Sequence, residues 1–344
     1  MFKYWKDEFM KTKRAVIIGG GLVGCLTAVE MQHKGFDVTI IDQFELGSGS
    51  SVAAGGILFP LMPWDYDEKV YDLCKSAANY YKYFSAILLK ETGIDPEYHE
   101  SGLIMINPVD NQKIFNWCDQ HDVDLKKITF NGSPSIELSN VSQIRPTQLM
   151  RSLKVYMQYL NIKVHVNSEI IDFKAERGEV TECLSSNGKK FIGEKFIITT
   201  GAWAANLLRE YKEKIYPIRG QMIQFPKSNL ELKKIMYHDG FYMIPRMDGT
   251  IVAGSTLEDV GFSIKETEGS IDDLKNKAEH IYPELIDVKI EKSWHGFRPG
   301  THNNIPIIGK YKDYKNLYLN VGHHRYGVTM APKSAEIITS LIMS

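Results

Sequence analysis

A glycine-rich turn near the N-terminus constrains the fold of this chain more than any other feature. The apolar stretch Ala15–Ile18 leads into three consecutive glycines, Gly19–Gly21, and then into the helix-forming stretch Leu22–Lys34. A second apolar stretch, Asp37–Ile41, follows after a short gap. A strand, a glycine turn, a helix and a second strand in this order predict a βαβ unit with parallel strands.

The spacing of the glycines indicates what this unit binds. Gly19, Gly21 and Gly24 follow the GxGxxG pattern. The first allows the tight turn, the second lets the backbone approach a pyrophosphate, and the third lets the helix pack closely on the sheet. The helix N-terminus directs N–H groups at phosphate oxygens, and Asp42 can accept hydrogen bonds from an adenosine ribose. We predict a dinucleotide-binding unit; a glycine-rich turn without a ligand is the alternative.

Composition argues against several other classes of protein. The chain has 344 residues, 43% of them hydrophobic, which is enough for a large core in two domains. The formal net charge is −1 and no basic block occurs, so no nucleic acid partner is predicted. Four widely separated cysteines without a CxxC pair predict reduced thiols and a cytoplasmic protein. No transmembrane segment is predicted, and Met1–Lys13 lack the apolar core of a signal peptide.

Strand and helix signals alternate along most of the chain, which predicts an α/β fold. Between residues 215 and 260 the pattern becomes rich in strands. We therefore predict a Rossmann-like dinucleotide-binding domain interleaved with a β-rich (α+β) substrate domain. The predicted segments are 1–76, 141–212 and 295–344 for the first domain, and 77–140 and 213–294 for the second.

Two helices are predicted outside the βαβ unit. Apolar residues recur every three or four positions from Val70 to Leu88, which predicts one long helix, and Gly93 is expected to end it. Near the C-terminus, the strand-like stretch Asn316–Val321 and a glycine-bounded loop precede a helix that is expected to begin at about Val328.

Further motifs span nearly the whole chain in a fixed order. They are Gly47–Trp64, Thr200–Trp203, Pro217–Gln221, Tyr242–Arg246, Gly254–Glu258, Gly296–Thr301, Ile305–Gly309 and Gly322–Pro332. With the N-terminal unit, they make the chain resemble the D-amino acid oxidase superfamily of flavoproteins, and most closely its glycine oxidase branch. Several motifs in order are more specific than one glycine signature. The resemblance implies FAD bound in an extended form.

The resemblance also implies which residues hold FAD. The loop from His323 to Thr329 would lie at the pyrimidine edge of the flavin, where a helix N-terminus supplies N–H donors and positive dipole. Covalent attachment in some relatives uses a cysteine close to the Gly296–Thr301 motif, but no cysteine follows Cys183 here, so non-covalent FAD is expected. The predicted cofactor-binding residues are Gly19, Gly21, Leu22, Gly24, Asp42, Gln43, Ser50, Ser51, Gly56, Ile57, Leu58, Ile170, Gly201, Trp203, His323, His324, Arg325, Tyr326, Gly327, Val328 and Thr329.

An amino acid substrate has to be held by its carboxylate, and a guanidinium fork can grip it through two hydrogen bonds. Arg298 matches the family's carboxylate arginine, Tyr242 the tyrosine that supports the same carboxylate, and Arg325 a second family substrate position. These are the predicted catalytic residues. Leu257 and Gly240 match positions that shape the side-chain pocket, and Gly240 replaces the histidine of some relatives, which would admit larger substrates. The histidines near the C-terminus have no standard ligand spacing, so no metal site is predicted.

The implied activity is oxidative deamination of glycine or a small D-amino acid. A hydride passes to the flavin, and the imine hydrolyses to an α-keto acid and ammonia. O2 then takes the electrons from the reduced flavin and becomes hydrogen peroxide. A link to thiamine biosynthesis is possible. One alternative is a D-amino acid dehydrogenase that uses a quinone or another acceptor. A tRNA-modifying FAD oxidase, an NAD-binding dehydrogenase and a non-catalytic nucleotide-binding module are further alternatives. Family members are often homo-oligomers, but the sequence leaves the oligomeric state open.

Overall fold

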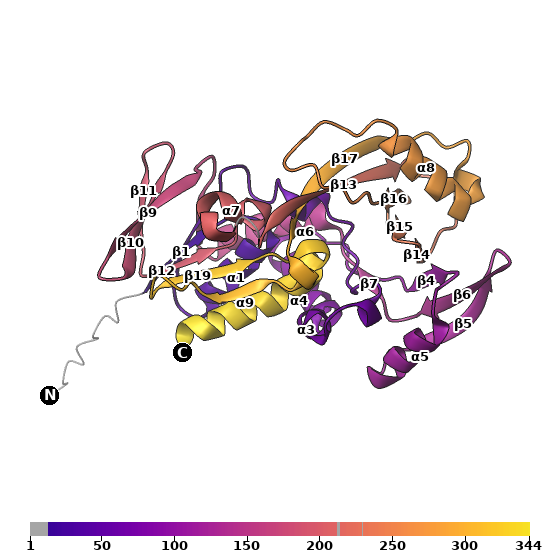
Figure 1. The fold of residues 1–344 in the computed structure, drawn as a ribbon, viewed down its shortest axis with the longest axis horizontal. Coiled ribbons are helices and arrows are strands. Elements are labelled where there is room, and N and C mark those ends of the chain that lie inside the picture. Colours follow the sequence, from indigo (N-terminus) through magenta and orange to yellow (C-terminus); the bar gives the residue numbers. More distant parts are fainter. Residues whose placement is uncertain (1–12, 212–213, 229) are drawn as a thin grey trace.

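Two β-sheets organise the molecule. The computed structural model describes residues 13–211, 214–228 and 230–344. Figure 1 shows a six-stranded sheet, which includes β1, β12 and β19, in one half and an eight-stranded sheet, which includes β13–β17, in the other. The predicted α/β class is confirmed.

The six-stranded sheet contains the predicted βαβ unit. Its strand order is β18 (Ile307–Lys310), β19 (Leu317–Val321), β12 (Lys195–Ile198), β1 (Arg14–Ile18), β2 (Asp37–Ile41) and β8 (Lys163–His165). All neighbouring pairs are parallel except the edge pair β18–β19. Helix α1 (Leu22–His33) connects β1 to β2, so this prediction is confirmed.

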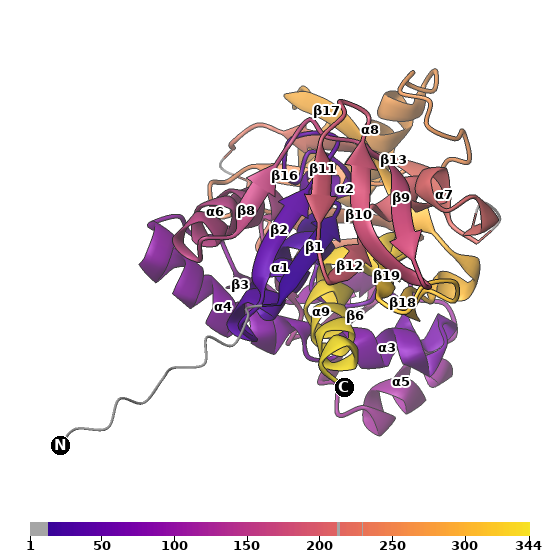
Figure 2. The ribbon, with the colours of Figure 1, turned by 90° about the vertical axis from the view of Figure 1, so that its left-hand side faces the viewer.

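Alternating residues of β1 face two different layers. Ala15 and Ile17 belong to a core shared with α1, α4 (Ala77–Thr92), α6 (Pro146–Tyr159) and α9 (Gly327–Met343). Val16 and Ile18 belong to a core on the other face, shared with the small sheet β9 (Ile170–Glu176), β10 (Glu179–Ser185) and β11 (Lys190–Ile192). Figure 2 shows α1 and α9 near the centre of the molecule, and the two helices pack against each other. A fully buried Val, Leu or Ile contributes roughly 1.5–3 kcal/mol, so the sheet is held firmly from both faces.

The predicted long helix from Val70 to Leu88 is wrong, because the chain forms two helices there. Helix α3 (Glu68–Cys74) ends before Ser76, and α4 begins at Ala77. The two helices have different partners: Val70 packs with the start of α9, whereas α4 packs into the core of the six-stranded sheet. Gly93 does end α4, in a left-handed conformation with φ 70°, as predicted.

The eight-stranded sheet carries the β-rich part of the chain. Its order is β17 (Lys292–Gly300), β13 (Tyr216–Phe225), β16 (Ile251–Gly254), β15 (Phe241–Pro245), β14 (Ile235–His238), β4 (Leu103–Ile106), β6 (Ser133–Leu138) and β5 (Leu125–Phe130). The pair β14–β4 is parallel and the others are antiparallel. Helix α8 (Ser270–Ile281) covers one face, and α5 (Asn111–Gln120) packs on the other. Shorter elements are α2 (Ser50–Ala53), α7 (Ala204–Leu207), β3 (His99–Glu100), β7 (Ser142–Gln143), η1 (Pro63–Asp65), η2 (Gly201–Trp203), η3 (Arg209–Tyr211), η4 (Pro283–Leu285), η5 (His302–Asn304) and η6 (His324–Tyr326).

The domain boundaries stay predictions, and the packing bears on two of them. Every strand of the six-stranded sheet comes from a segment assigned to the dinucleotide domain. Helix α4 lies in a segment assigned to the substrate domain, yet it packs on the six-stranded sheet. The boundary between residues 294 and 295 falls inside β17, and the one between 212 and 213 lies outside the described residues.

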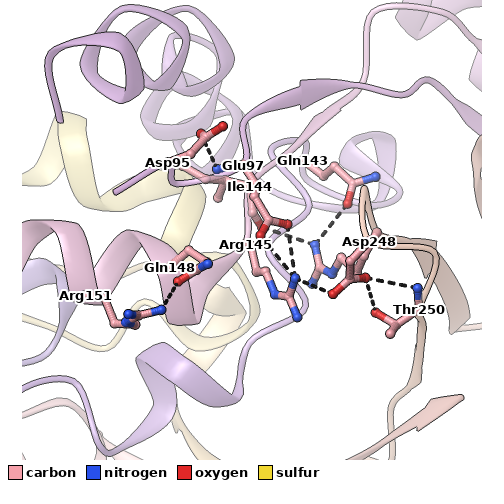
Figure 3. Close-up of polar contacts among 10 residues, drawn as sticks. Asp95, Glu97, Gln143, Ile144, Arg145, Gln148, Arg151, Asp248 and Thr250 are labelled. Carbon is pink, nitrogen blue, oxygen red and sulfur yellow. Dashed lines mark hydrogen bonds and ion pairs between the residues drawn. The ribbon is translucent and has the colours of Figure 1, made fainter. Parts of the chain in front are cut away.

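A polar junction joins the two halves of the molecule (Figure 3). Arg145 Nη1, just before α6, donates to Glu97 Oε1 at 3.1 Å and to Asp248 Oδ2 at 2.8 Å. Asp248 lies in the turn between β15 and β16. Burial alone would raise the pKa of Asp248, but hydrogen bonds from Thr250 and Arg145 lower it to about 2. The Asp248 carboxylate therefore stays charged and holds the β15–β16 hairpin against α6.

Candidate cofactor and substrate site

A cavity of ≈ 360 Å³ is lined by residues of both sheets. Ile18, Ile41 and Thr199 line it from the carboxyl ends of β1, β2 and β12. Met222 and Tyr242 line it from β13 and β15 of the other sheet. Ligands of open parallel sheets bind at the carboxyl ends of the strands, so this cavity is the candidate site.

Most of the predicted site residues line this cavity. All three predicted catalytic residues do, and so do all predicted cofactor-binding residues except Gly24 and Leu58. Leu58 is buried in the core of the six-stranded sheet, and its backbone N–H donates to Ser142 O at 2.8 Å. It supports the lining loop from behind and does not itself line the cavity.

Gly24 lies behind the glycine turn, where α1 meets the sheet. A Cβ atom at this position would overlap the Gly19 carbonyl oxygen and lie 2.6 Å from Thr199 Oγ1. Only glycine lets α1 begin this close to β1 and β12. Gly19 itself has φ 113°, a backbone conformation that favours glycine. The predicted packing role of Gly24 therefore has a steric basis, although Gly24 does not line the cavity.

Asp42 ties the end of β2 to the glycine turn. Its Oδ2 accepts from Gly20 N at 2.5 Å and its Oδ1 from Phe44 N at 2.7 Å. Burial raises the pKa of Asp42, and the bonds from Phe44 and Gly20 oppose that shift. A carboxylate offers about four lone-pair sites, so two remain for ribose hydroxyl groups.

The loop after β2 meets the start of α1 and strand β17. Ser51 Oγ accepts a hydrogen bond from Leu22 N at 2.8 Å, which satisfies one free donor at the helix N-terminus. The proton of this hydroxyl group is then free to donate to an anion at the turn. Ser50 Oγ donates to the Phe297 carbonyl oxygen, which anchors the loop to β17.

Three cavity-lining side chains have a buried polar atom with no partner in the described part of the chain. They are Thr200 Oγ1, Asn320 Oδ1 and His323 Nε2. A buried polar atom without a partner costs about 1–3 kcal/mol, so a polar ligand would stabilise this wall. Helix α9 begins here with no side-chain cap, and Gly327, Val328 and Thr329 line the cavity. These features suit a long ligand with phosphates at the glycine turn and a polar ring edge at α9.

Arg298 on β17 forms the centre of the other end of the cavity. Its Nη2 donates to Ser255 Oγ at 2.6 Å and its Nη1 to Thr256 O at 3.2 Å. The guanidinium lies across Gly220 of the neighbouring strand β13, where a Cβ atom would be 2.5 Å from Arg298 Cζ. Tyr242 OH lies 3.3 Å from Ser255 Oγ, so one hydroxyl group connects two of the three predicted catalytic side chains, Arg298 and Tyr242.

Sequence reasoning missed Ser255 and Gly220 as site residues. Both lie in motifs that carried the family resemblance, but their roles depend on strand register. Gly220 is opposite Gly296 across β13 and β17, and Tyr242 is opposite Gly254 across β15 and β16. These pairings bring together residues that are far apart in sequence.

Positive charge dominates this end of the cavity. Burial lowers the pKa of Arg298; Tyr242 opposes this shift and Arg325 adds to it. A guanidinium nevertheless stays protonated in proteins. Burial and the charges of Arg298 and Arg325 lower the pKa of His324 to about 3, and burial lowers the pKa of His323 to about 4. Both histidines are therefore neutral at pH 7, and the arginines carry the charge.

The two predicted pocket-shaping residues have different positions. Gly240 lines the cavity, and a Cβ atom there would meet nothing within 4 Å. Leu257 is 54% exposed and does not line the cavity, so the structure does not bring it to the site. The chain turns away from the site after Thr256, and Glu258 then pairs with Arg219 of β13.

A buried arginine links the eight-stranded sheet to the loop that lines the cavity. Arg246, at the end of β15, donates to Gly55 O at 2.7 Å, Gln143 Oε1 at 2.9 Å and Ile144 O at 3.3 Å. Gly55 lines the cavity. Arg246 thus fixes the lining loop from the same region of the hairpin that contacts Arg145 in Figure 3.

Comparison with known proteins decides the family. Residues 14–341 match the family model described as FAD dependent oxidoreductase, DAO. The chain belongs to this family. Glycine oxidase from Pseudomonas aeruginosa is 32% identical over 346 residues, covering 96% of this chain and 95% of that protein. The bifunctional protein ThiO/ThiG from Trichormus variabilis is 28% identical, covering 96% of this chain and 53% of that protein.

Solved structures agree on the fold. The crystal structure of glycine oxidase from Bacillus cereus has a TM-score of 0.87 at 24% identity, covering 96% of this chain and 95% of that chain. The cofactor of this oxidoreductase is FAD, which replaces the NAD alternative. None of the four cysteines Cys25, Cys74, Cys118 and Cys183, all of them described and free, lines the cavity.

Among residues 13–211, 214–228 and 230–344, no group of three or more His, Cys, Asp or Glu residues is arranged to hold a metal ion. Within the same ranges, no helix combines the length and apolar character needed to cross a membrane.

Proposed function

We propose that this oxidoreductase oxidises the CH–NH2 group of glycine or a small D-amino acid. The imine product hydrolyses to an α-keto acid and ammonia. One observation carries the proposal: the Arg298 guanidinium, beside Tyr242 and Ser255, lies in the same cavity as the glycine turn and the N-terminus of α9. An arginine in this setting suits a substrate that carries a carboxylate.

The residues of the chain orient the substrate. Arg298 binds the carboxylate through its fork of N–H donors, and Ser255 and Thr256 hold that fork in place. Tyr242 reaches the same carboxylate from β15, which β13 and β16 separate from β17. FAD, when bound, accepts the hydride from the α-carbon. The described cavity wall has no carboxylate at this end, so orientation and charge, rather than a side-chain base, promote the step.

The residues around FAD have complementary tasks. The glycine turn, Ser51 and the N-terminus of α1 would hold the pyrophosphate, and Asp42 would hold the ribose. Helix α9 and the turn that begins at His323 would lie at the flavin edge, where their N–H groups would stabilise negative charge. The absence of a cysteine from the cavity wall supports non-covalent FAD.

The electron acceptor and the metabolic role complete the proposal. O2 accepts the electrons and yields hydrogen peroxide; a quinone or another acceptor is the alternative, as in a dehydrogenase. Similarity to the ThiO/ThiG protein supports a role of the product in thiamine biosynthesis. A cytoplasmic location and a homo-oligomeric state stay predictions.

A peroxide-release screen tests this function. Purified FAD-loaded protein is mixed with glycine, sarcosine and a panel of D-amino acids, and peroxide, ammonia and the keto acid are measured together. The proposal predicts equal amounts of the three products for at least one small amino acid. Electron transfer to a dye without peroxide would indicate a dehydrogenase, and no turnover with either acceptor would contradict the proposed reaction.

A further inference from the structure

The charged side chains that line the cavity are divided between its two ends. They are Asp42, Glu169, Arg298 and Arg325. Asp42 directly follows β2 and Glu169 directly precedes β9, and both lie near the predicted ribose site. Both arginines lie at the substrate end, on β17 and η6, and the charge of Arg325 acts on Arg298. The substrate end therefore carries two positive charges and, in the described wall, no negative charge.

One substrate carboxylate balances only one of these charges. Arg298 has neutral acceptors alone, Ser255 and Thr256, and is the proposed partner of the α-carboxylate. Arg325 is exposed and makes no hydrogen bond or ion pair with any residue in the described ranges. A second anionic group on the substrate would supply the missing partner.

Contacts of the neighbouring residues fix the backbone that carries Arg325. Tyr326 OH, on the next residue, donates to Leu61 O at 2.7 Å, and the ring of Tyr326 packs edge-on against Tyr66. On the other side, His324 Nδ1 contacts Asn304 Oδ1. The turn thus holds Arg325 at the cavity, and only the side chain has to order when an anion binds.

Space for a second group is present in the same cavity. Gly240 belongs to its lining, and a Cβ atom at this position would meet nothing within 4 Å. A substrate larger than glycine can therefore extend beyond its α-carbon without displacing a side chain at this position.

We propose that Arg325 binds a second carboxylate of the substrate, so that the preferred substrate is a small amino acid with two carboxylates. This inference rests on the proposed oxidation of an amino acid whose α-carboxylate binds Arg298. The second carboxylate is carried by a short side chain, as in D-aspartate, or by an N-carboxymethyl group.

Matched substrates test the proposal. D-Aspartate and D-asparagine have nearly the same shape and differ in the charge of the side chain. We expect kcat/KM for D-aspartate to exceed that for D-asparagine roughly 10-fold to 100-fold, the range of one charge-assisted hydrogen-bonded contact. In Arg325→Gln the ratio should fall to about one, because the glutamine carries no charge. Arg151→Gln is the control, since Arg151 is an exposed arginine on α6 outside the cavity, bonded to Gln148.

Binding of unreactive analogues gives a second readout that needs no turnover. Succinate and succinamate are D-aspartate and D-asparagine without the amine, and each perturbs the absorbance of bound flavin if it occupies the site. Tighter binding of succinate than of succinamate, lost in Arg325→Gln and kept in Arg151→Gln, supports the proposal. Equal binding of the two analogues, or a preference that survives Arg325→Gln, overturns it.

The two proposals fail in different ways. If glycine is oxidised and the ratio of D-aspartate to D-asparagine is near one, the second-carboxylate site is wrong and the proposed function stands. If no amino acid is oxidised but succinate binding depends on Arg325, the dicarboxylate site stands and the proposed reaction is wrong.

Discussion

The two ends of the cavity are built in different ways. At the cofactor end, contiguous stretches of backbone do most of the work: the glycine turn after β1, the loop before α2 and the start of α9. At the substrate end, side chains from separate strands meet: Arg298 from β17, Tyr242 from β15 and Ser255 directly after β16. Local sequence specifies the first end, whereas strand register assembles the second.

This difference implies that the ends can be damaged separately. A substitution at the glycine turn should affect FAD binding and stability together, because the turn also packs α1 on the sheet. A substitution around Arg298 should leave the flavin bound and reduce turnover. Four predictions test this separation, and they are ordered from the largest expected change in free energy to the smallest.

Acid should destabilise the FAD-free protein through the buried His323. The pKa of His323 is about 4 in the folded protein, whereas an unfolded histidine has a pKa of about 6.5. Because the pKa of His323 is lower in the folded protein, the unfolded protein binds the proton first as the pH falls. The stability that the neutral His323 contributes is therefore fully present above about pH 6.5 and is lost as the pH falls towards 4. The free energy of unfolding of FAD-free protein should fall by up to about 1.4 kcal/mol per pH unit, about 3 kcal/mol in all.

Urea unfolding of the wild type and His323→Asn between pH 7.5 and 4.5 measures this contribution. The wild type should lose more stability than the variant over this range. His33→Asn, at an exposed position in the last turn of α1, is the control and should follow the wild type. Parallel curves for the wild type and His323→Asn would contradict the prediction.

Gly220→Ala should damage the substrate end alone. The added Cβ atom would occupy the space of the Arg298 guanidinium, which has to move. We expect kcat/KM to fall about 100-fold, as for a misplacement of about 1 Å in a binding group, with the flavin content unchanged. Steady-state kinetics in a double-mutant cycle checks the cause. In an Arg298→Ala background, Gly220→Ala should reduce kcat/KM only slightly further. An equal loss of kcat/KM from Gly220→Ala in both backgrounds would contradict this account.

Gly24→Ala should damage the cofactor end. The added atom would overlap the Gly19 carbonyl oxygen, so α1 has to shift from the sheet. We expect a loss of about 2 kcal/mol in the free energy of unfolding and weaker FAD retention. Gly309→Ala is the matched control, because a Cβ atom there would meet nothing within 4 Å. Thermal unfolding and the flavin-to-protein absorbance ratio measure both effects; equal behaviour of the two variants would show that the close approach of α1 is unimportant.

Ser255→Ala should have the smallest effect, again at the substrate end. It removes the acceptor of Arg298 Nη2 and the link to Tyr242, but leaves Thr256 O in place. We expect roughly a 10-fold loss of kcat/KM, the equivalent of one hydrogen bond, with full flavin content. Ser293→Ala, at an exposed position on β17, is the control. A loss of flavin in Ser255→Ala would place this residue at the cofactor instead.

For a physical reason, the sequence allows more to be predicted of the cofactor end than of the substrate end. Gly19, Gly21 and Asp42 form a local pattern whose spacing follows from one βαβ unit, so it can be read directly. Ser255 and Gly220 matter only through cross-strand pairing, which no local pattern specifies. Leu257 shows the same limit, because a family position two residues from the site turned out to be on the surface.

Helix packing was the other feature that periodicity did not reveal. The apolar period continues from Val70 to Leu88, but α3 and α4 pack against different neighbours, and the break near Ser76 follows from that tertiary choice. Gly93 was predictable because a left-handed helix end is a local requirement.

Carboxylate binding by Arg298 is tested most directly by titrating flavin absorbance with acetate in the wild type and in Arg298→Ala. We predict a saturable change in the wild type, and in the variant a full complement of FAD with acetate binding at least about 100-fold weaker, the cost of removing one partner of a buried charged pair. Equal acetate affinity in the two proteins, or loss of FAD from the variant, would contradict the separation of the two ends.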